Sequence, residues 1–519
     1  MNIVPRNRES IMKTNATRNQ NGSVMLQKVQ DDKKWQTSET RSEIDAGKPP
    51  LLFSKRLLIA VLLFLTNANM IFVRYNVNVA VVEMAFPKPI NASGHGNGNG
   101  SGNDTEMQPA EFQWDSKTVG LVLSILFYGN LLSFLSGFVI SKMGGSKSMS
   151  IMLLICGITT FLHPIALRSS FYLFLFCRFM TGIMAGFANA SLVEACSHWM
   201  PKSERGTLMA ICFNGLYVAT AIIHPIVGFI ISVGGWPMVF YSTGVVSFLL
   251  SLVCLILIRN HPSEDNWISK KELSYILEET TTTRKRTGTT YPYIVILTSV
   301  PVAMLCIMNL LCSWSVSIVL TSLPLFLKDS TGKGTEEVAF ISSLPCILGI
   351  FISLLGGPLM DYWKNHSSIT LTQMHKIVIG IAYTTQFILL VAVTFVQDLV
   401  ATIIIFVLIS LFQPLMSLLL QLICVNLAPN HTGLIAGYTF IWYATGPIAA
   451  QTVAGFMTPC HSISEWNSYF LLTAGIILFG TVLFVLYGSS EPQPWSMSPN
   501  SEKKLNLTEK NEEESVTSR

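Results

Sequence analysis

The sequence predicts an all-α polytopic membrane protein with twelve transmembrane helices, and three observations support this fold class. Half of the 519 residues are hydrophobic, and only 12% are charged, about half of the ~25% typical of a soluble domain. The charges crowd into 1–56, 259–286 and 489–519. Apolar runs of about 20 residues, long enough to cross a bilayer, recur between them. This pattern excludes a soluble enzyme, a secreted disulfide-rich protein and a single-pass receptor.

The apolar runs divide into twelve candidate spans that form two groups of six. They lie at 57–84, 117–140, 149–167, 171–196, 207–232, 238–258, 300–325, 338–359, 376–395, 399–425, 433–456 and 467–488. The longest internal polar stretch, 259–297, separates the sixth span from the seventh. We therefore expect two six-helix bundles, 55–258 and 298–488, joined by a charged cytoplasmic loop.

Basic residues near the ends of the spans predict which side of the membrane each loop occupies. Arg56 precedes the first span, Lys142 follows the second and Arg205 follows the fourth. All three lie on one side, together with the central loop and both termini, and an excess of Lys and Arg marks the cytoplasmic side. The tails 1–54 and 489–519 lack apolar periodicity, so we expect both to be disordered in the cytoplasm.

The segment 85–113 then faces the extracytosolic side of the membrane. It is rich in Gly and Asn and contains acceptor sequons at Asn91, Asn99 and Asn103, which predict glycosylation. The first 50 residues are polar, so we expect no cleavable signal peptide, and the first span itself directs the chain to the membrane.

Several kinds of chemistry have no signature in the sequence. The net charge of +4 is too small and too scattered to indicate nucleic-acid binding. The ten cysteines are spread singly, without CxxC or His/Cys ligand spacing, so we interpret them as small core residues. A GxxxxGK[ST] nucleotide motif is absent, so ATP is not the direct energy source. We expect no catalytic residue, metal site or cofactor.

Two related loop motifs follow the second and eighth spans. The first reads Gly137-Phe-Val-Ile-Ser141-Lys142-Met-Gly-Gly-Ser-Lys, and the second reads Gly356-Gly-Pro-Leu-Met-Asp361. With six plus six spans, they resemble the major facilitator superfamily, whose loop signature carries a glycine, an acid and basic residues. Ser141 stands where the acid is usual, whereas Asp361 retains it. The resemblance implies the major facilitator fold, with two halves that rock about a central site.

Further motifs narrow the family. They are Gln113-Trp114-Asp115, Trp199-Met-Pro201-Lys-Ser-Glu204-Arg205-Gly206, Gly235-Trp236-Pro237, Leu320-Thr-Ser-Leu-Pro324 and Asn426-Leu-Ala-Pro429. In this order and spacing, from about residue 55 to Trp495, the chain is similar to the anion transporter family of sialin, the vesicular glutamate transporters and the sodium/phosphate cotransporters. The resemblance implies a transporter of small anions.

Three ionisable residues lie inside spans, where such residues are costly and usually functional: Arg74, Arg178 and Glu194. Arg74 lies about ten residues, or roughly 15 Å, from the outer end of its span, and Arg178 about seven residues from the same side. We expect both guanidinium groups to converge on one cavity and to bind a carboxylate or phosphate bidentately. The alternative is that helix-end carbonyls or Glu83 satisfy both arginines.

Polar and aromatic residues within the spans are further candidates for substrate binding. They are Asn78, Tyr128, Asn214, Tyr217, His224, Trp314, Gln413 and Gln421. Hydrogen bonds between helices are the alternative role of the polar residues, and packing or interface anchoring is that of the aromatic ones. Glu194 and Asp361 are candidates for coupling or gating; for Glu194 we favour a gate in which it pairs with a basic loop residue such as Arg205.

Two departures from the family bear on the coupling ion. Sialin carries glutamates at the places of Thr181 and Ala185, and the vesicular glutamate carriers have a histidine at the place of Leu123. Because these titratable groups are absent here, the resemblance does not extend to an obligatory proton coupling. The coupling ion, sodium or proton, stays open.

The sequence therefore predicts a monomeric secondary active transporter, a symporter of small organic or inorganic anions that works by alternating access. Monoanions rank above glutamate because the seventh span lacks a further cation. The alternatives are a proton-coupled, sialin-like carrier of acidic sugars, a vesicular glutamate-type carrier or, in another class, an anion channel or a non-transporting receptor. We favour the plasma membrane over the lysosomal or synaptic vesicle membrane.

Overall fold

The computed structural model describes most of the chain between residue 49 and residue 496. The described residues are 49–85, 88–89, 107–108, 111–112, 114–280, 293–323, 326–327, 335–396, 398–460 and 462–496. The three sequons at Asn91, Asn99 and Asn103 lie outside these residues, as do 1–48 and 497–519.

The N-terminal half consists of seven helices in the described residues. They are α2 (Lys55–Ala85), α3 (Ser116–Asn130), α4 (Ser136–Met143), α5 (Gly145–Ser169), α6 (Phe171–Trp199), α7 (Arg205–Phe213) and α8 (Gly215–Leu257). The short helix η1 (Leu131–Leu135) joins α3 to α4. Between α2 and α3, β1 (Lys88–Pro89) pairs antiparallel with β2 (Met107–Gln108).

The C-terminal half is built in the same way from α10 to α17. Its helices are α10 (Tyr293–Thr298), α11 (Val300–Ser317), α13 (Thr335–His366), α14 (Leu371–Val393), α15 (Leu399–Leu427), α16 (Thr432–Met457) and α17 (Ile463–Tyr487). The short helix η3 (Ile318–Ser322) extends α11, and η4 (Pro494–Ser496) follows α17.

The described helices provide twelve membrane crossings. Nine stretches are long and apolar enough to span a membrane, and one of them, Arg205–Leu257, contains two spans. These two spans meet at Gly235, whose φ of 68° breaks the helix within α8, a conformation that glycine adopts at little cost. α13 and α16, with 32 and 26 residues, supply the remaining two crossings. The predicted all-α polytopic fold is therefore confirmed.

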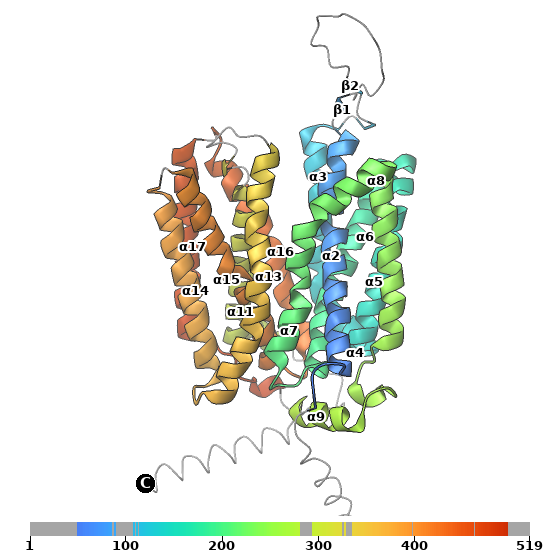
Figure 1. Ribbon diagram of the computed structural model, residues 1–519, viewed down its shortest axis with the longest axis vertical. Coiled ribbons are helices and arrows are strands. Elements are labelled where there is room, and N and C mark those ends of the chain that lie inside the picture. The colour runs from blue at the N-terminus through green and yellow to red at the C-terminus, as the bar shows by residue number, and fades with distance from the viewer. Residues whose placement is uncertain are drawn as a thin grey trace, which may run out of the picture.

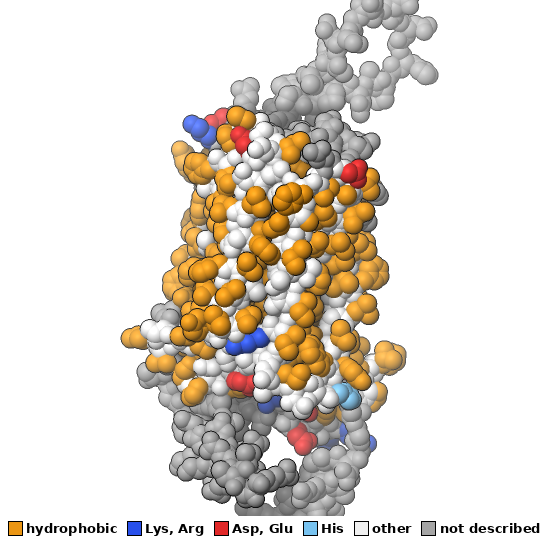
Figure 2. Space-filling model, turned by 90° about the vertical axis from the view of Figure 1, so that its left-hand side faces the viewer, with side chains coloured by type: hydrophobic (Ala, Val, Ile, Leu, Met, Phe, Trp, Pro, Cys, Tyr) orange, Lys and Arg blue, Asp and Glu red, His pale blue; other side chains and the backbone are white. Residues whose placement is uncertain are grey.

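The two halves stand side by side (Figure 1). The β1–β2 ribbon lies at one end of the helices, and α9 (Lys270–Thr280), in the loop between the halves, lies at the other. Figure 2 shows one side of the molecule, where hydrophobic side chains cover the middle and charged side chains gather toward the two ends. The exposed fractions of Leu355 and Phe479 are 69% and 68%, which suits contact with lipid.

The central loop is more ordered than its polar composition indicates. In the described residues it contains η2 (Pro262–Glu264) and α9, which pack against the first residues of α2. The Lys55 ammonium lies 3.0 Å from the Asp265 carboxylate, and the backbone N–H groups of Lys55 and Arg56 donate to the Glu272 carboxylate. Glu272 therefore caps the N-terminus of α2, which attaches the loop to the N-terminal half.

Candidate functional site

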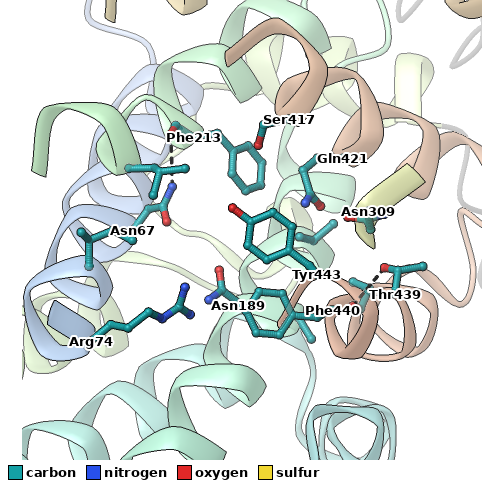
Figure 3. A pocket seen from close by; sticks show the side chains of 15 residues that line it. Asn67, Arg74, Asn189, Phe213, Asn309, Ser417, Gln421, Thr439, Phe440 and Tyr443 are labelled. Carbon is teal, nitrogen blue, oxygen red and sulfur yellow. Dashed lines mark hydrogen bonds between the residues drawn. The ribbon is translucent and has the colours of Figure 1, made fainter. Parts of the chain in front are cut away.

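A small cavity of about 50 Å³ lies between the two halves (Figure 3). Both halves contribute to its wall, through α2, α6, α7 and α8 on one side and α11, α15 and α16 on the other. The lining residues are Asn67, Ile71, Arg74, Asn189, Ala190, Val193, Phe213, Leu216, Asn309, Ser417, Gln421, Ala436, Thr439, Phe440 and Tyr443. A site shared by two halves is what alternating access requires.

Arg74 is the one charged side chain among the described residues that line this cavity. Its exposed fraction is only 7%, and its Nε and Nη2 atoms have no hydrogen-bond partner in the described part of the chain. In Figure 3 the guanidinium points toward Asn189 and the ring of Phe440. A buried guanidinium without an acceptor is costly, so this arrangement favours an anionic ligand.

The remaining polar atoms of the wall are amides and hydroxyls. Asn67, Asn189, Asn309 and Gln421 bring amide groups to the cavity, and Ser417, Thr439 and Tyr443 bring hydroxyls. Some already have protein partners: the Asn67 amide nitrogen donates to the carbonyl of Phe213 at 3.4 Å. Neutral groups of this kind orient a ligand by hydrogen bonds, while Arg74 supplies the charge.

Arg178 lies elsewhere in the structure, contrary to the expectation that both arginines line one cavity. It is completely buried in α6 and is not among the residues of the cavity wall. Its three guanidinium nitrogens have no hydrogen-bond partner among the described residues. The number of residues from the end of a span gives a depth in the membrane but not the direction of the side chain, which explains the difference.

The other predicted binding residues fall into three groups. Gln421 lines the cavity with Arg74. Tyr217 and Gln413 line a second, mostly apolar pocket, which shares Leu216 with the first. Asn78, Tyr128 and His224 are exposed, and Asn214 and Trp314 are buried; none of these five lines either pocket.

Trp314 shows why a tryptophan in a span is a weak indication of a binding site. Its indole N–H donates to the Thr473 hydroxyl at 3.4 Å, and its side chain is 5% exposed. It therefore packs α11 against α17, inside the C-terminal half.

Asn309, Thr439 and Phe440 line the cavity although the sequence did not single them out. They lie in α11 and α16, where the spans contain no charge that draws attention to one face. Thr439 and Tyr443 are four residues apart and therefore share a face of α16. This four-residue spacing of polar side chains is the sequence feature that indicates a polar face on α16.

Glu194 and Asp361 lie at contacts between the halves, toward the end of the molecule that carries α9. Glu194 Oε2 accepts a hydrogen bond of 2.6 Å from the backbone N–H of Gly433. Its other carboxylate oxygen lies 3.3 Å from His198 Nε2. The hydrogen bonds of Arg205 go instead to the Asn426 side chain and the Met200 carbonyl, so the predicted Glu194–Arg205 pair is not among the contacts that the structure shows.

Asp361 makes the second of these contacts. Its carboxylate accepts hydrogen bonds of 2.8 Å and 2.7 Å from the backbone N–H groups of Gly206 and Thr207. The Ser133 hydroxyl adds a bond of 2.9 Å to the Gly437 carbonyl. These hydrogen bonds join the halves on the side that carries α9, so the structure is closed on that side.

A cluster of cations surrounds the Asp361 contact. Lys202, Arg205 and Lys364 line one small pocket together with Asp361, and the Lys364 ammonium donates to the Lys202 carbonyl at 2.8 Å. In the loop between α6 and α7, burial and the neighbouring charge of Arg205 lower the pKa of Lys202, while Glu279 acts in the opposite direction. The cations compensate the Asp361 carboxylate at the closed interface.

The fold and the shared cavity define a membrane transporter whose two halves each cross the membrane six times. The model of the Major Facilitator Superfamily matches residues 57–451. The chain belongs to this superfamily, and it is a multi-pass membrane transporter rather than an enzyme.

Relatives with curated names place it closer to the anion transporters. The chain is 28% identical to an uncharacterized transporter of Caenorhabditis elegans, slc-17.2, over 86% of its own length and 94% of the relative's. It is 25% identical to zebrafish (Danio rerio) vesicular glutamate transporter 3, over 87% and 77%, and 25% identical to human sialin, over 89% and 96%. The resemblance to this anion transporter family is thereby confirmed.

A solved structure supports the fold alone. The proton:xylose symporter XylE, bound to 6-bromo-6-deoxy-D-glucose, superposes with a TM-score of 0.62 at 12% identity. The match covers 84% of this chain and 97% of that chain.

Proposed function

We propose that this protein is a secondary active carrier of small organic or inorganic anions, which it moves by alternating access. The observation that carries the proposal is Arg74, a buried guanidinium without an acceptor, in a cavity whose described wall contains no carboxylate. Its planar fork matches a carboxylate or phosphate. The names of sialin and of vesicular glutamate transporter 3 agree with an acidic substrate.

Arg178 is a second cation in the same half, and we propose that it contributes to the anion path. It lies nearer the outer end of α6 than Asn189, which lines the cavity. A fully buried, unpaired arginine inside a membrane span is costly and is usually retained for function. Arg178 therefore attracts the anion on its way to Arg74.

We infer that proton coupling is not obligatory and that sodium or the membrane potential supplies the drive. Thr181 and Ala185 occupy the places of sialin's glutamates, and neither Glu nor His occurs among the described residues that line the cavity. An arginine that keeps its proton cannot carry one across. We further propose a monomer in the plasma membrane.

Uptake into proteoliposomes tests this function. Carboxylate, phosphate and acidic-sugar anions are screened under separately imposed proton, sodium and voltage gradients. A carrier shows saturable uptake that rises when the same anion is present on the opposite side of the membrane. Uptake without saturation or trans-stimulation would instead identify an anion channel, and binding without flux would identify a receptor.

A further inference from the structure

A glycine occupies the same place near the start of one helix in each half. Gly206 is the second residue of α7 in the N-terminal half, and Gly433 is the second residue of α16 in the C-terminal half. The first backbone N–H groups of a helix have no acceptor within the helix. In both cases a carboxylate from the opposite half accepts this hydrogen bond, at 2.8 Å for Gly206 and 2.6 Å for Gly433.

Asp361, the acid of the loop motif that begins at Gly356, caps α7. It follows Gly357 by four residues on α13, so the two residues share one helix face. Gly357 packs against Gly206, and a Cβ atom on Gly206 would lie 2.7 Å from Asp361 Oδ1. The small residues therefore bring the two halves close enough for the Asp361 carboxylate to reach the start of α7.

The N-terminal half repeats this arrangement without the acid. Gly137 on α4 packs against Leu434 of α16, as Gly357 packs against α7. Four residues later stands Ser141, whose hydroxyl donates to the Phe138 carbonyl of its own helix at 2.7 Å. The position that holds a carboxylate in one half thus holds only a hydroxyl in the other.

Glu194 reaches the same helix start from a different helix. It lies on α6, is 3% exposed and accepts from Gly433 through Oε2. A Cβ atom on Gly145 would lie 2.7 Å from Glu194 Cγ, so the glycine at the start of α5 makes room for this side chain. The other carboxylate oxygen faces His198, 3.3 Å away.

We propose that Glu194 replaces the acid missing at Ser141 and forms the second of two carboxylate latches that hold the cytoplasmic side closed. Asp361 latches α13 to α7, and Glu194 latches α6 to α16. Opening toward the cytoplasm separates the halves and therefore breaks both hydrogen bonds at once. Each carboxylate also interacts favourably with the positive end of the helix it caps. This inference goes beyond the proposed function, because the latch acts whichever anion is carried.

The test is a thiol accessibility measurement on the full-length protein in inside-out membrane vesicles. Ala190, which lines the cavity and is 1% exposed, is changed to Cys. A membrane-impermeant maleimide then reports how often the cavity opens to the cytoplasmic side. Labelling of the protein without Ala190→Cys is subtracted, since the chain has native cysteines. Five proteins are compared: the Ala190→Cys parent, and this parent with Glu194→Ala, with Glu194→Gln, with Glu194→Ala plus Ser141→Asp, and with Asp398→Asn.

Loss of one charge-assisted hydrogen bond across the interface shifts the ratio of open to closed states by roughly tenfold or more. We therefore expect Glu194→Ala to increase the labelling rate by about that factor, and Glu194→Gln by less, because an amide oxygen still accepts. Ser141→Asp, added to Glu194→Ala, restores slow labelling. Asp398→Asn is the matched control, because Asp398 caps its own helix at Ala401 and does not join the halves; it leaves the rate unchanged.

Two results would overturn the proposal. One is a labelling rate in Glu194→Ala equal to that of the parent. The other is failure of Ser141→Asp to slow labelling in Glu194→Ala. Should Glu194→Ala not reach the membrane, the near-isosteric Glu194→Gln decides, because a rate equal to that of the parent contradicts a charged latch.

Discussion

The Arg74 guanidinium in α2 lies over the Phe440 ring in α16, 5.6 Å from the ring centroid. The cation of the cavity thus contacts an aromatic face from the opposite half. A cation above a ring is attracted to its negative face and gains part of the stabilisation that water would supply. We propose that the halves rock in alternating access, which would change this contact and make the environment of the proposed anion site differ between the two facing states.

Removal of the Phe440 ring tests that contact. A cation–π interaction is worth about 0.5–2 kcal/mol, so Phe440→Leu should change the KM for uptake roughly two- to thirtyfold while the protein still reaches the membrane. Phe479→Leu, on the exposed surface of α17, is the control and leaves KM unchanged. Equal KM values for both variants and the parent would show that Phe440 takes no part in the site.

We expect replacement of Arg178 to affect thermal stability and anion uptake differently. Replacing a buried, unpaired charge by an apolar group of similar length removes a desolvation cost. Arg178→Met should therefore unfold at the same or a higher temperature than the parent, whereas its anion uptake falls by about tenfold or more. Thermal unfolding and uptake are measured on the same preparation. Lower thermal stability with normal uptake would show that Arg178 is structural.

The coupling prediction uses voltage-clamped proteoliposomes without sodium. An imposed proton gradient should fail to concentrate the anion, because the described wall of the cavity offers no carboxylate or imidazole. His224, which the sequence suggested as a binding residue of the fifth span, is exposed and lies outside both pockets. Strong accumulation that His224→Ala or Glu194→Gln abolishes would contradict this prediction and identify the proton site.

The topology prediction concerns the loop between α2 and α3. Glycosidase should shift the electrophoretic mobility of the protein expressed in animal cells, and the triple Asn91/Asn99/Asn103→Gln variant should show no shift. Its control is Asn430→Gln, at a sequon between α15 and α16, which we expect on the cytoplasmic side and whose loss leaves the shift intact. A shift that survives the triple change would contradict the orientation.

The sequence predicts the fold better than the site, and particular residues show why. Apolar runs indicate the twelve spans, and basic loop residues indicate their orientation. The break between the fifth and sixth spans falls at Gly235, the first residue of the Gly-Trp-Pro motif. Arg74 is recognisable because a charge inside a span is rare. The side-chain direction of Arg178 depends on how α6 is rotated against its neighbours, which a single sequence does not report.

Neutral lining residues are harder still to predict. Asn309, Thr439 and Asn214 are all uncharged polar residues within spans. Asn309 and Thr439 line the cavity, whereas Asn214 is buried outside its wall. Only the packing of the two halves decides which polar groups face the cavity. The replacement that we propose, of an acid at position 141 by Glu194, is likewise not predictable from the sequence, because Ser141 lies on α4 and Glu194 reaches α16 from α6.

We propose that Arg74 binds the transported anion, and anion uptake by the Arg74→Lys variant measures that contribution. Lysine keeps the charge but lacks the planar fork, and a hydrogen bond to a charged group is worth about 1.5–3 kcal/mol. We therefore expect Arg74→Lys to lose roughly 10- to 150-fold in apparent affinity. Arg168→Lys, at an arginine whose side chain is 59% exposed beside Glu111, keeps normal affinity. Normal affinity and rate in membrane-inserted Arg74→Lys would show that the Arg74 fork does not bind the anion.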